Sequence, residues 1–132
     1  MNATNDIVTK LIADTTLISL LGITATDPKL YPVRAPQNAV EPYIVYSVIS
    51  DGGMEEILKE FTVQLNVCGT YSQIQNIEKA IDAILDLQDR ISITSSNYYF
   101  RWSKKVSGND VYDELTDTNF RVLLYDFKLH SK

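Results

Sequence analysis

Two stretches of the chain place apolar residues at the three- and four-residue spacing of an amphipathic helix. The first lies within residues 7–21, where Asp14 marks a joint, so that one long helix and two short helices are both open. The second begins with a capping box at residues 72–75 and runs to about Leu87. Its apolar face, which needs a sheet to bury it, consists of Ile74, Ile77, Ile81, Ile84 and Leu85.

The segment between these helices predicts a β-hairpin. Residues 43–50 are rich in β-branched and aromatic side chains, and residues 61–68 alternate apolar and polar side chains with the period of a half-buried strand. A turn signal at residues 51–53 joins them, so residues 43–68 are expected to form the hairpin. The proline-containing stretch 23–42 is expected to be a loop with a short strand at residues 29–33. The second helix should pack on the strand face formed by Phe61, Val63, Leu65 and Val67.

Two further strands are predicted at residues 92–103 and 120–130, and the polar segment 106–118 is either a long hairpin loop or part of extended strands. The order of elements predicts a single α+β domain over residues 1–132, with an antiparallel sheet of about four strands and two helices packed on one face. Side chains of the first of these strands alternate between two faces, of which one belongs to the core and the other is exposed. One face carries Tyr98, Phe100 and Trp102, and the other carries Tyr99, Arg101 and Ser103.

The composition narrows the functional classes. The chain has 132 residues, a formal net charge of −5 and 45% hydrophobic residues, which are values of a folded globular protein. A net acidic chain is a poor non-specific DNA binder, because phosphate binding draws on Lys and Arg. A single cysteine excludes an internal disulfide. The N-terminal residues and the lack of a long apolar run predict an intracellular protein with no signal peptide and no membrane span.

No residue constellation in the sequence predicts catalysis. His130, the single histidine, is expected to face solvent, and Cys68 is expected to be an inert residue at a strand end. We therefore expect no enzymatic activity, no metal and no cofactor. Four acidic residues do not match the spacing of an EF-hand and are expected to form a solvated loop, with a divalent-cation site as the alternative: Asp110, Asp113, Glu114 and Asp117.

The second helix carries an acidic stripe. Glu78, Asp82 and Asp86 lie at successive four-residue steps, so their side chains share one face of the helix. The stripe is either an ordinary solvent face or a surface that repels phosphate.

Residues 98–105 interleave aromatic rings with Arg101, Lys104 and Lys105. Proteins that bind single-stranded nucleic acid use such combinations, because bases stack on the rings beside a basic groove. The simpler interpretation, which we favour, is a strand with one buried and one exposed face.

The order of several short motifs resembles a known family. Asp14-x-x-Leu17 leads to Leu21-Gly22, and these are followed by Leu30-Tyr31-Pro32, Ala35-Pro36-Gln37 and Pro42-Tyr43-Ile44-Val45-Tyr46. Together with the alternating strand, the helix and a terminal strand at residues 120–127, this order resembles the tail-completion proteins of long-tailed bacteriophages, also called tail terminators or tail-to-head joining proteins. The resemblance covers almost the whole chain and departs from the family in the polar segment 103–119.

The resemblance implies a structural protein without catalytic residues. It implies a small α+β subunit that assembles into a hexameric ring, caps the finished tail tube and contacts the head connector. The expected partners are other copies of the chain, the tail tube protein and the head connector. The expected location is the tail or neck of the virion, after assembly in the host cytoplasm. DNA is expected to pass through the ring without specific binding, in keeping with the acidic chain.

Two segments are expected to meet partners in such a ring. The basic residues Arg101, Lys104 and Lys105 should pair with acidic groups of a neighbouring subunit or the connector. If the chain is not a tail-completion protein, the alternative functions are another neck or minor capsid protein, and a small nucleic-acid-binding module that uses residues 98–105. The second segment is the turn that carries an apolar residue between charges, as loops that bind partners often do: Asp51, Gly52, Gly53, Met54, Glu55 and Glu56.

Overall fold

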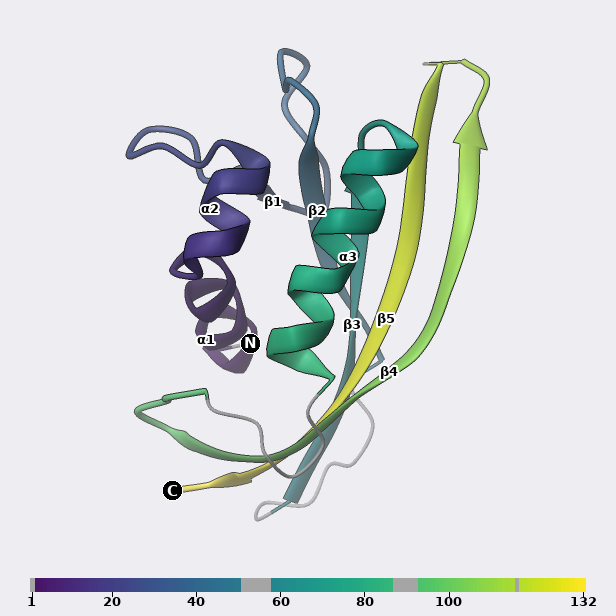
Figure 1. Cartoon of the computed structure of the whole chain (residues 1–132). Coiled ribbons are helices and arrows are strands. Elements are labelled where there is room, and N and C mark those ends of the chain that lie inside the picture. Colours follow the sequence, from purple (N-terminus) through teal and green to yellow (C-terminus); the bar gives the residue numbers. More distant parts are fainter. Residues whose placement is uncertain (1, 51–57, 87–92, 116) are drawn as a thin grey trace.

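The computed structural model describes residues 2–50, 58–86, 93–115 and 117–132. These residues form three helices and five strands (Figure 1). In chain order the elements are α1 (Asn2–Ile12), α2 (Thr15–Leu21), β1 (Leu30–Pro32), β2 (Tyr43–Ser50), β3 (Leu58–Cys68), α3 (Tyr71–Leu85), β4 (Tyr98–Asp113) and β5 (Thr118–Ser131).

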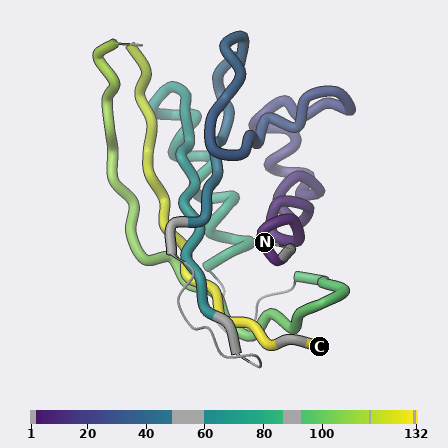
Figure 2. The backbone as a smooth tube through the Cα atoms, turned by 180° about the vertical axis from the view of Figure 1, so that it is seen from behind, coloured from purple at the N-terminus to yellow at the C-terminus, as the bar shows by residue number. Residues whose placement is uncertain are grey.

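The strands form one mixed sheet, and the helices lie together on one of its faces. The strand order is β1-β2-β3-β5-β4, in which β1 runs parallel to β2 and the other neighbours are antiparallel. In the described part of the chain no helix covers the opposite face, which we call the open face (Figure 1, Figure 2). The prediction of an α+β fold with helices on one face is confirmed. The prediction of a purely antiparallel sheet of about four strands was wrong, because the short strand β1 joins the sheet as a fifth strand parallel to β2.

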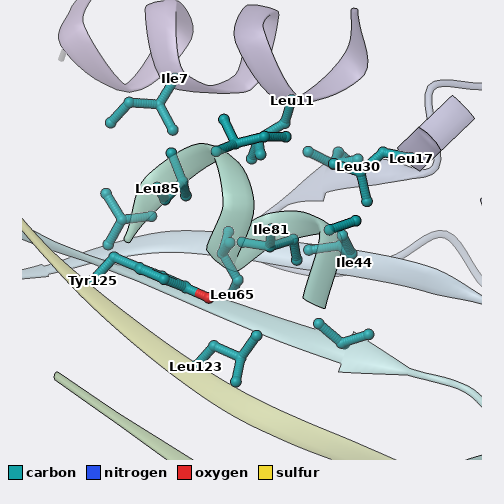
Figure 3. Packing of buried hydrophobic residues seen from close by; sticks show 14 of the residues in the cluster. Ile7, Leu11, Leu17, Leu30, Ile44, Leu65, Ile81, Leu85, Leu123 and Tyr125 are labelled. Carbon is teal, nitrogen blue, oxygen red and sulfur yellow. The ribbon is translucent and has the colours of Figure 1, made fainter. Parts of the chain in front are cut away.

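The first helical stretch consists of two short helices. Asp14 separates them, because its carboxylate accepts a hydrogen bond from the backbone N–H of Leu17 at 3.0 Å and so caps the start of α2. Gly22 ends α2 in the left-handed conformation, with φ at 74°. The joint lets both helices turn apolar residues toward the sheet, and Ile7 and Leu11 of α1 are buried in the core (Figure 3).

The predicted hairpin and the short strand are both present. β2 and β3 pair antiparallel from Tyr43 opposite Cys68 to Ser50 opposite Thr62, while residues 51–57 lie outside the described residues. β1 falls inside the predicted strand at 29–33 and pairs parallel to β2, with Leu30 beside Ile44. The sequence did not predict this pairing, because a three-residue strand carries too little alternation to specify a register.

α3 begins with a capping box that lies two residues earlier than predicted. The Thr70 hydroxyl accepts from the backbone N–H of Gln73 at 3.3 Å, and the Gln73 side chain accepts from the backbone N–H of Thr70 at 2.9 Å. The prediction at residues 72–75 was wrong because Thr70-x-x-Gln73 satisfies the same pattern and stands closer to the end of β3.

The core lies between the helices and the sheet (Figure 3). The predicted apolar face of α3 is buried, and Ile77, Ile81 and Leu85 are 0% exposed. They belong to one cluster with the predicted face of β3, whose four apolar residues are at most 2% exposed. The predicted packing of α3 on β3 is therefore confirmed. Burying each such side chain contributes about 1.5–3 kcal/mol relative to leaving it exposed, and this burial holds the helix on the sheet.

β4 and β5 form a long hairpin that includes most of the polar segment 106–118. Of the two possibilities left open by the sequence, the structure has the extended strands. β4 contains two register shifts, between Phe100 and Trp102 and between Lys105 and Ser107. Such β-bulges bend a strand, and the hairpin curves along the sheet from the C-terminal end of the chain to its tip (Figure 1).

The first bulge changes which side chains of β4 reach the core. Phe100 packs against the core as predicted, but Trp102 lies opposite Lys128 on the open face. Ser103 is 0% exposed and donates its hydroxyl to the backbone carbonyl of Leu85 at 2.5 Å. The prediction that Trp102 shares a face with Phe100, and Ser103 a face with Arg101, was wrong, because the extra residue in the bulge shifts the alternation by one.

Candidate functional site

A group of charged side chains joins α3 to the β4–β5 hairpin, and we call it the charged cluster. Its members are Glu78, Asp82, Lys105, Asp110 and Arg121. The Glu78 carboxylate accepts from the Lys105 ammonium and from Arg121 Nη1, the latter at 2.5 Å. Lys105 Nζ also lies 3.1 Å from Asp82, and Arg121 Nε lies 2.6 Å from Asp110. Each cation therefore bridges two carboxylates.

Local features of β4 make room for this contact. A Cβ atom at Gly108 would lie 3.4 Å from Glu78 Oε2 and 3.2 Å from the Leu123 side chain, so glycine lets the helix carboxylate come close to the strand. The second bulge follows Lys105, which pairs with Tyr125 in the sheet and reaches the carboxylates of α3. The hairpin is thereby fastened to the helix by side chains as well as by the core.

Tyr125 connects the charged cluster to the core. Its side chain is 0% exposed, and its hydroxyl donates to Asp82 at 2.5 Å. Burial and this hydrogen bond raise the pKa of Tyr125, so the phenol remains a hydrogen-bond donor. Sequence reasoning missed both Tyr125 and Arg121. The alternation of β5 could have identified them, since both residues lie on the same face of the strand as buried Leu123. A cation on the face that points to the core needs a carboxylate partner.

The charged cluster is partly shielded from water, with the side chains of Glu78 and Arg121 only 16% and 13% exposed. Burial would raise the pKa of Glu78, but hydrogen bonds from Lys105 and Arg121 outweigh it and hold that pKa below its ordinary value. Burial would lower the pKa of Lys105, whereas its bonds to Glu78 and Asp82 raise it. Both groups are therefore charged at neutral pH, and their attraction ties the hairpin to α3.

The predicted acidic stripe lies at this boundary. Glu78 and Asp82 belong to the charged cluster, and Asp86 accepts from the backbone N–H of Lys105 at 3.1 Å. All three carboxylates face the hairpin, where Lys105 and Arg121 offset part of their charge. A phosphate-repelling role for the stripe stays a prediction.

A second group of polar and aromatic residues lies on the open face near the start of β4, and we call it the basic end: Tyr99, Arg101, Trp102, Lys104 and Lys128. Arg101 Nε donates to His130 Nδ1 at 3.2 Å, and its guanidinium lies 5.2 Å from the centre of the Tyr99 ring. Lys128 Nζ lies 5.1 Å from the centre of the Trp102 ring. Cations above aromatic faces attract the ring electrons, so rings and charges hold each other in place.

A groove opens beside Trp102 in the basic end. Its volume is about 340 Å³, and its walls include Glu60, Thr62, Asp126 and Lys128. Thr62 donates to Asp126 at 2.5 Å, and Lys128 lies 3.8 Å from Glu60. The groove therefore has an aromatic wall and a rim of both charges.

The basic residues predicted to meet a partner are divided between these two groups. Arg101 and Lys104 are exposed at the basic end, whereas Lys105 has carboxylate partners in its own chain. The other predicted partner segment, residues 51–56, lies outside the described residues.

The far end of the hairpin, which we call the hairpin tip, comprises residues 113–115 and 117. Asp113 accepts from the backbone N–H of Leu115 at 3.0 Å, and Asp117 accepts from the Tyr112 hydroxyl at 2.5 Å. The Leu115 side chain is 97% exposed. The predicted acidic loop is thus divided, with Asp110 in the charged cluster and its other members at the tip. Among the described residues, no group of three or more His, Cys, Asp or Glu side chains is placed to hold a metal ion.

Cys68 is buried at the end of β3, and burial raises the pKa of its thiol to about 11. We expect this thiol to react with a disulfide reagent at pH 8 more than about 100-fold more slowly than a free cysteine, whose pKa is about 8.5, because only the thiolate attacks. Absorbance of the released thiol measures the rate. Protein unfolded in urea is the control and should react at the ordinary rate, and similar rates for native and unfolded protein would contradict this expectation.

None of the helices in the described part of the chain is long and apolar enough to cross a membrane. No protein-family model and no curated protein matches the sequence. A chain in a solved structure of the virion of a native gene transfer agent (GTA) particle has a similar fold, with a TM-score of 0.67 and 13% sequence identity. The match covers 94% of this chain and 91% of that chain. At this identity the likeness establishes a shared fold over nearly the full length of both chains.

Proposed function

We propose that the protein is a structural subunit of a phage neck, which caps the tail tube and joins it to the head connector as a ring. The observation that carries this proposal is the likeness in fold to a chain solved within a virion, over 94% of the present chain. The order of motifs shared with tail-completion proteins favours the neck over other parts of a virion. The proposed partners are other copies of the chain in a hexameric ring, the tail tube protein and the head connector.

A ring subunit needs surfaces that meet neighbours and a body that keeps its shape. The open face and the projecting hairpin provide such surfaces (Figure 2). The charged cluster has a structural role, since it fastens the hairpin to α3. We therefore propose no enzymatic activity for this chain.

Measurement of mass in solution, with and without tail tubes, tests the proposal. The tubes are assembled from a phage tail tube protein, which the proposal expects to be encoded near this gene. We expect the chain to bind the ends of these tubes as a hexameric ring, which electron microscopy would show as a cap. A chain that leaves the tubes uncapped at every concentration would contradict the proposal, whereas a monomer in the absence of tubes would agree with it.

The nucleic-acid module is the second candidate, and it is favoured by the exposure of Tyr99, Arg101 and Lys104 on the open face. We expect no measurable affinity for duplex or single-stranded DNA at about 0.15 M salt, where charges are screened beyond about 8 Å. The net charge of −5 opposes phosphate binding, and Lys105 is already paired. A fluorescence anisotropy titration measures the affinity.

The matched control is a variant in which Arg101, Lys104 and Lys105 are all replaced by alanine. If the native chain binds DNA with a dissociation constant in the micromolar range or below, and the variant does not, the neck proposal gives way to the nucleic-acid module. Equal, negligible binding by both proteins is the expected result.

A further inference from the structure

The two ends of the β4–β5 hairpin carry opposite charge. The hairpin tip has three carboxylates, from Asp113, Glu114 and Asp117, and no basic residue occurs at positions 113–118. Glu114 and Asp117 are exposed to solvent. The tip therefore places three carboxylates at the far end of the hairpin (Figure 1), and Arg34 lines the same pocket as Asp113.

The basic end of the same hairpin presents cations on the open face. Arg101 and Lys104 are exposed, and Lys132 Nζ lies 5.0 Å from the centre of the neighbouring Tyr99 ring. Lys128 stands at the rim of the groove beside Trp102. Two carboxylates also face this surface, from Glu60 and Asp126, and they offset only part of its positive charge.

The two ends match in apolar surface as well as in charge. Leu115 is a large apolar side chain, 97% exposed between the acidic residues of the tip. The groove at the basic end has Trp102 as its aromatic wall, and its volume of about 340 Å³ is ample for a leucine side chain. An apolar side chain that leaves water for such a groove supplies binding energy, and the surrounding charges supply orientation.

We propose that the hairpin tip of one copy of this chain docks on the basic end of a second copy. Leu115 enters the groove beside Trp102, and the tip carboxylates lie against Lys104 and Lys128. This inference rests on the proposed function as a ring subunit. Because the contact uses a different patch on each partner, it leaves a free tip and a free basic end on every pair. Repetition of the contact adds further copies and closes a ring where the rotation between neighbours completes a circle.

A single chain cannot make this contact with itself. Lys104 and Asp113 are both on β4, and at about 3.3 Å per residue the nine residue steps from one to the other span about 30 Å. The charges therefore complement each other only between copies.

Nucleic acid fits the groove less well than a second copy does. Glu60 and Asp126 line the groove and would repel phosphate, whereas the tip places an apolar side chain there. The tip carboxylates can then reach Lys128, which lines the groove, and Lys104, which lies opposite Asp126 in the sheet.

Zero-length carbodiimide cross-linking tests the contact on the native chain, since it joins a carboxylate to an amine already in contact. Equal amounts of unlabelled and ¹⁵N-labelled protein are mixed at high concentration, and mass spectrometry identifies cross-links that combine both isotopes. We expect cross-links from residues 113–117 to Lys104 or Lys128 at about tenfold or greater yield than to Lys79. Lys79 is the matched control, because it is an exposed lysine on α3.

A charge exchange tests the pairing independently. Glu114→Lys and Lys104→Glu are each expected to lower the yield of the inter-chain cross-link to Lys128 about tenfold, because each sets like charges against each other while the Lys128 amine stays in place. The double variant should recover most of the native yield, and Lys79→Glu should leave it unchanged. Circular dichroism checks that each variant is folded.

Three results would overturn the docking contact. The first is equal cross-linking to Lys79 and to the basic end. The second is an inter-chain cross-link yield that stays unchanged in the Glu114→Lys and Lys104→Glu variants. The third is single-stranded DNA that binds the basic end in place of the tip. Rings that still form on tail tubes in the first two cases would leave the proposed function standing. Native protein that cross-links as expected but never caps tubes would instead count against the neck function alone.

Discussion

Replacing Ile81 with alanine is expected to lower the free energy of unfolding by about 2–5 kcal/mol. Ile81 is 0% exposed and lies at the centre of the face that α3 presents to the sheet (Figure 3). Removing three carbons there leaves a cavity that neighbouring side chains fill only in part, because α3 is held by contacts along its whole length. Urea unfolding followed by circular dichroism gives the change directly.

Ile18→Ala is the matched control for this prediction. Ile18 is also an isoleucine in a helix, but its side chain is 36% exposed. The same truncation should cost less than about 1 kcal/mol there, since the side chain gives up less buried surface. Equal losses for the two variants would mean that the α3 face does not form the core.

Replacing Glu78 with glutamine is expected to destabilise the protein by about 1–3 kcal/mol at pH 7, because it leaves Lys105 and Arg121 without their shared carboxylate. The size of the loss should depend on pH. The pKa of Glu78 in the folded chain lies below its ordinary value of 4.5, so its charged form stabilises the fold. This contribution is complete above the ordinary value and is lost as the pH falls through the folded pKa.

The measurement is the difference in unfolding free energy between the native protein and the Glu78→Gln variant, taken at pH 7 and at successively lower pH. The difference should shrink once the pH falls below the ordinary glutamate pKa of 4.5. Glu60→Gln is the control, because Glu60 and Lys128 form an exposed pair with side chains 48% and 49% exposed. Such pairs contribute at most about 1 kcal/mol. A difference for Glu78 that does not change with pH would show that its charge is not the source of the stability.

The sequence predicted the elements that strict periodicity defines. The isoleucines of α3 and the alternating residues of β3 each have a single face that can be buried, so their packing could be foreseen. Asp14 marked a joint, but the sequence did not decide between one long helix and two short helices. That choice depends on the contact between the Asp14 carboxylate and the backbone N–H of Leu17. The parallel pairing of β1 depends on tertiary packing rather than on three residues of local pattern.

The candidate site was harder to foresee, because it depends on register. The extra residue near Arg101 moves Trp102 to the open face and Ser103 to the core, and no local pattern announces such a bulge. The acidic stripe on α3 was visible at its four-residue spacing. The cations that pair with this stripe were not predicted, since Lys105 and Arg121 come from two strands whose positions under the helix are fixed only in the folded sheet.

The place of β5 in the sheet has a consequence for biosynthesis. β5 follows every other described strand in the chain, yet it lies between β3 and β4 and pairs with both along most of their length. While the ribosome is still translating residues 98–113, β3 has no partner on one side, and β4 has no neighbour to pair with. Folding rates fall as contacts join residues more distant in sequence, and β3 and β5 are such a pair. We therefore expect the nascent chain to complete its sheet only after β5 emerges, so that translation pauses before residue 118 would prolong exposure of an unpaired strand edge to aggregation.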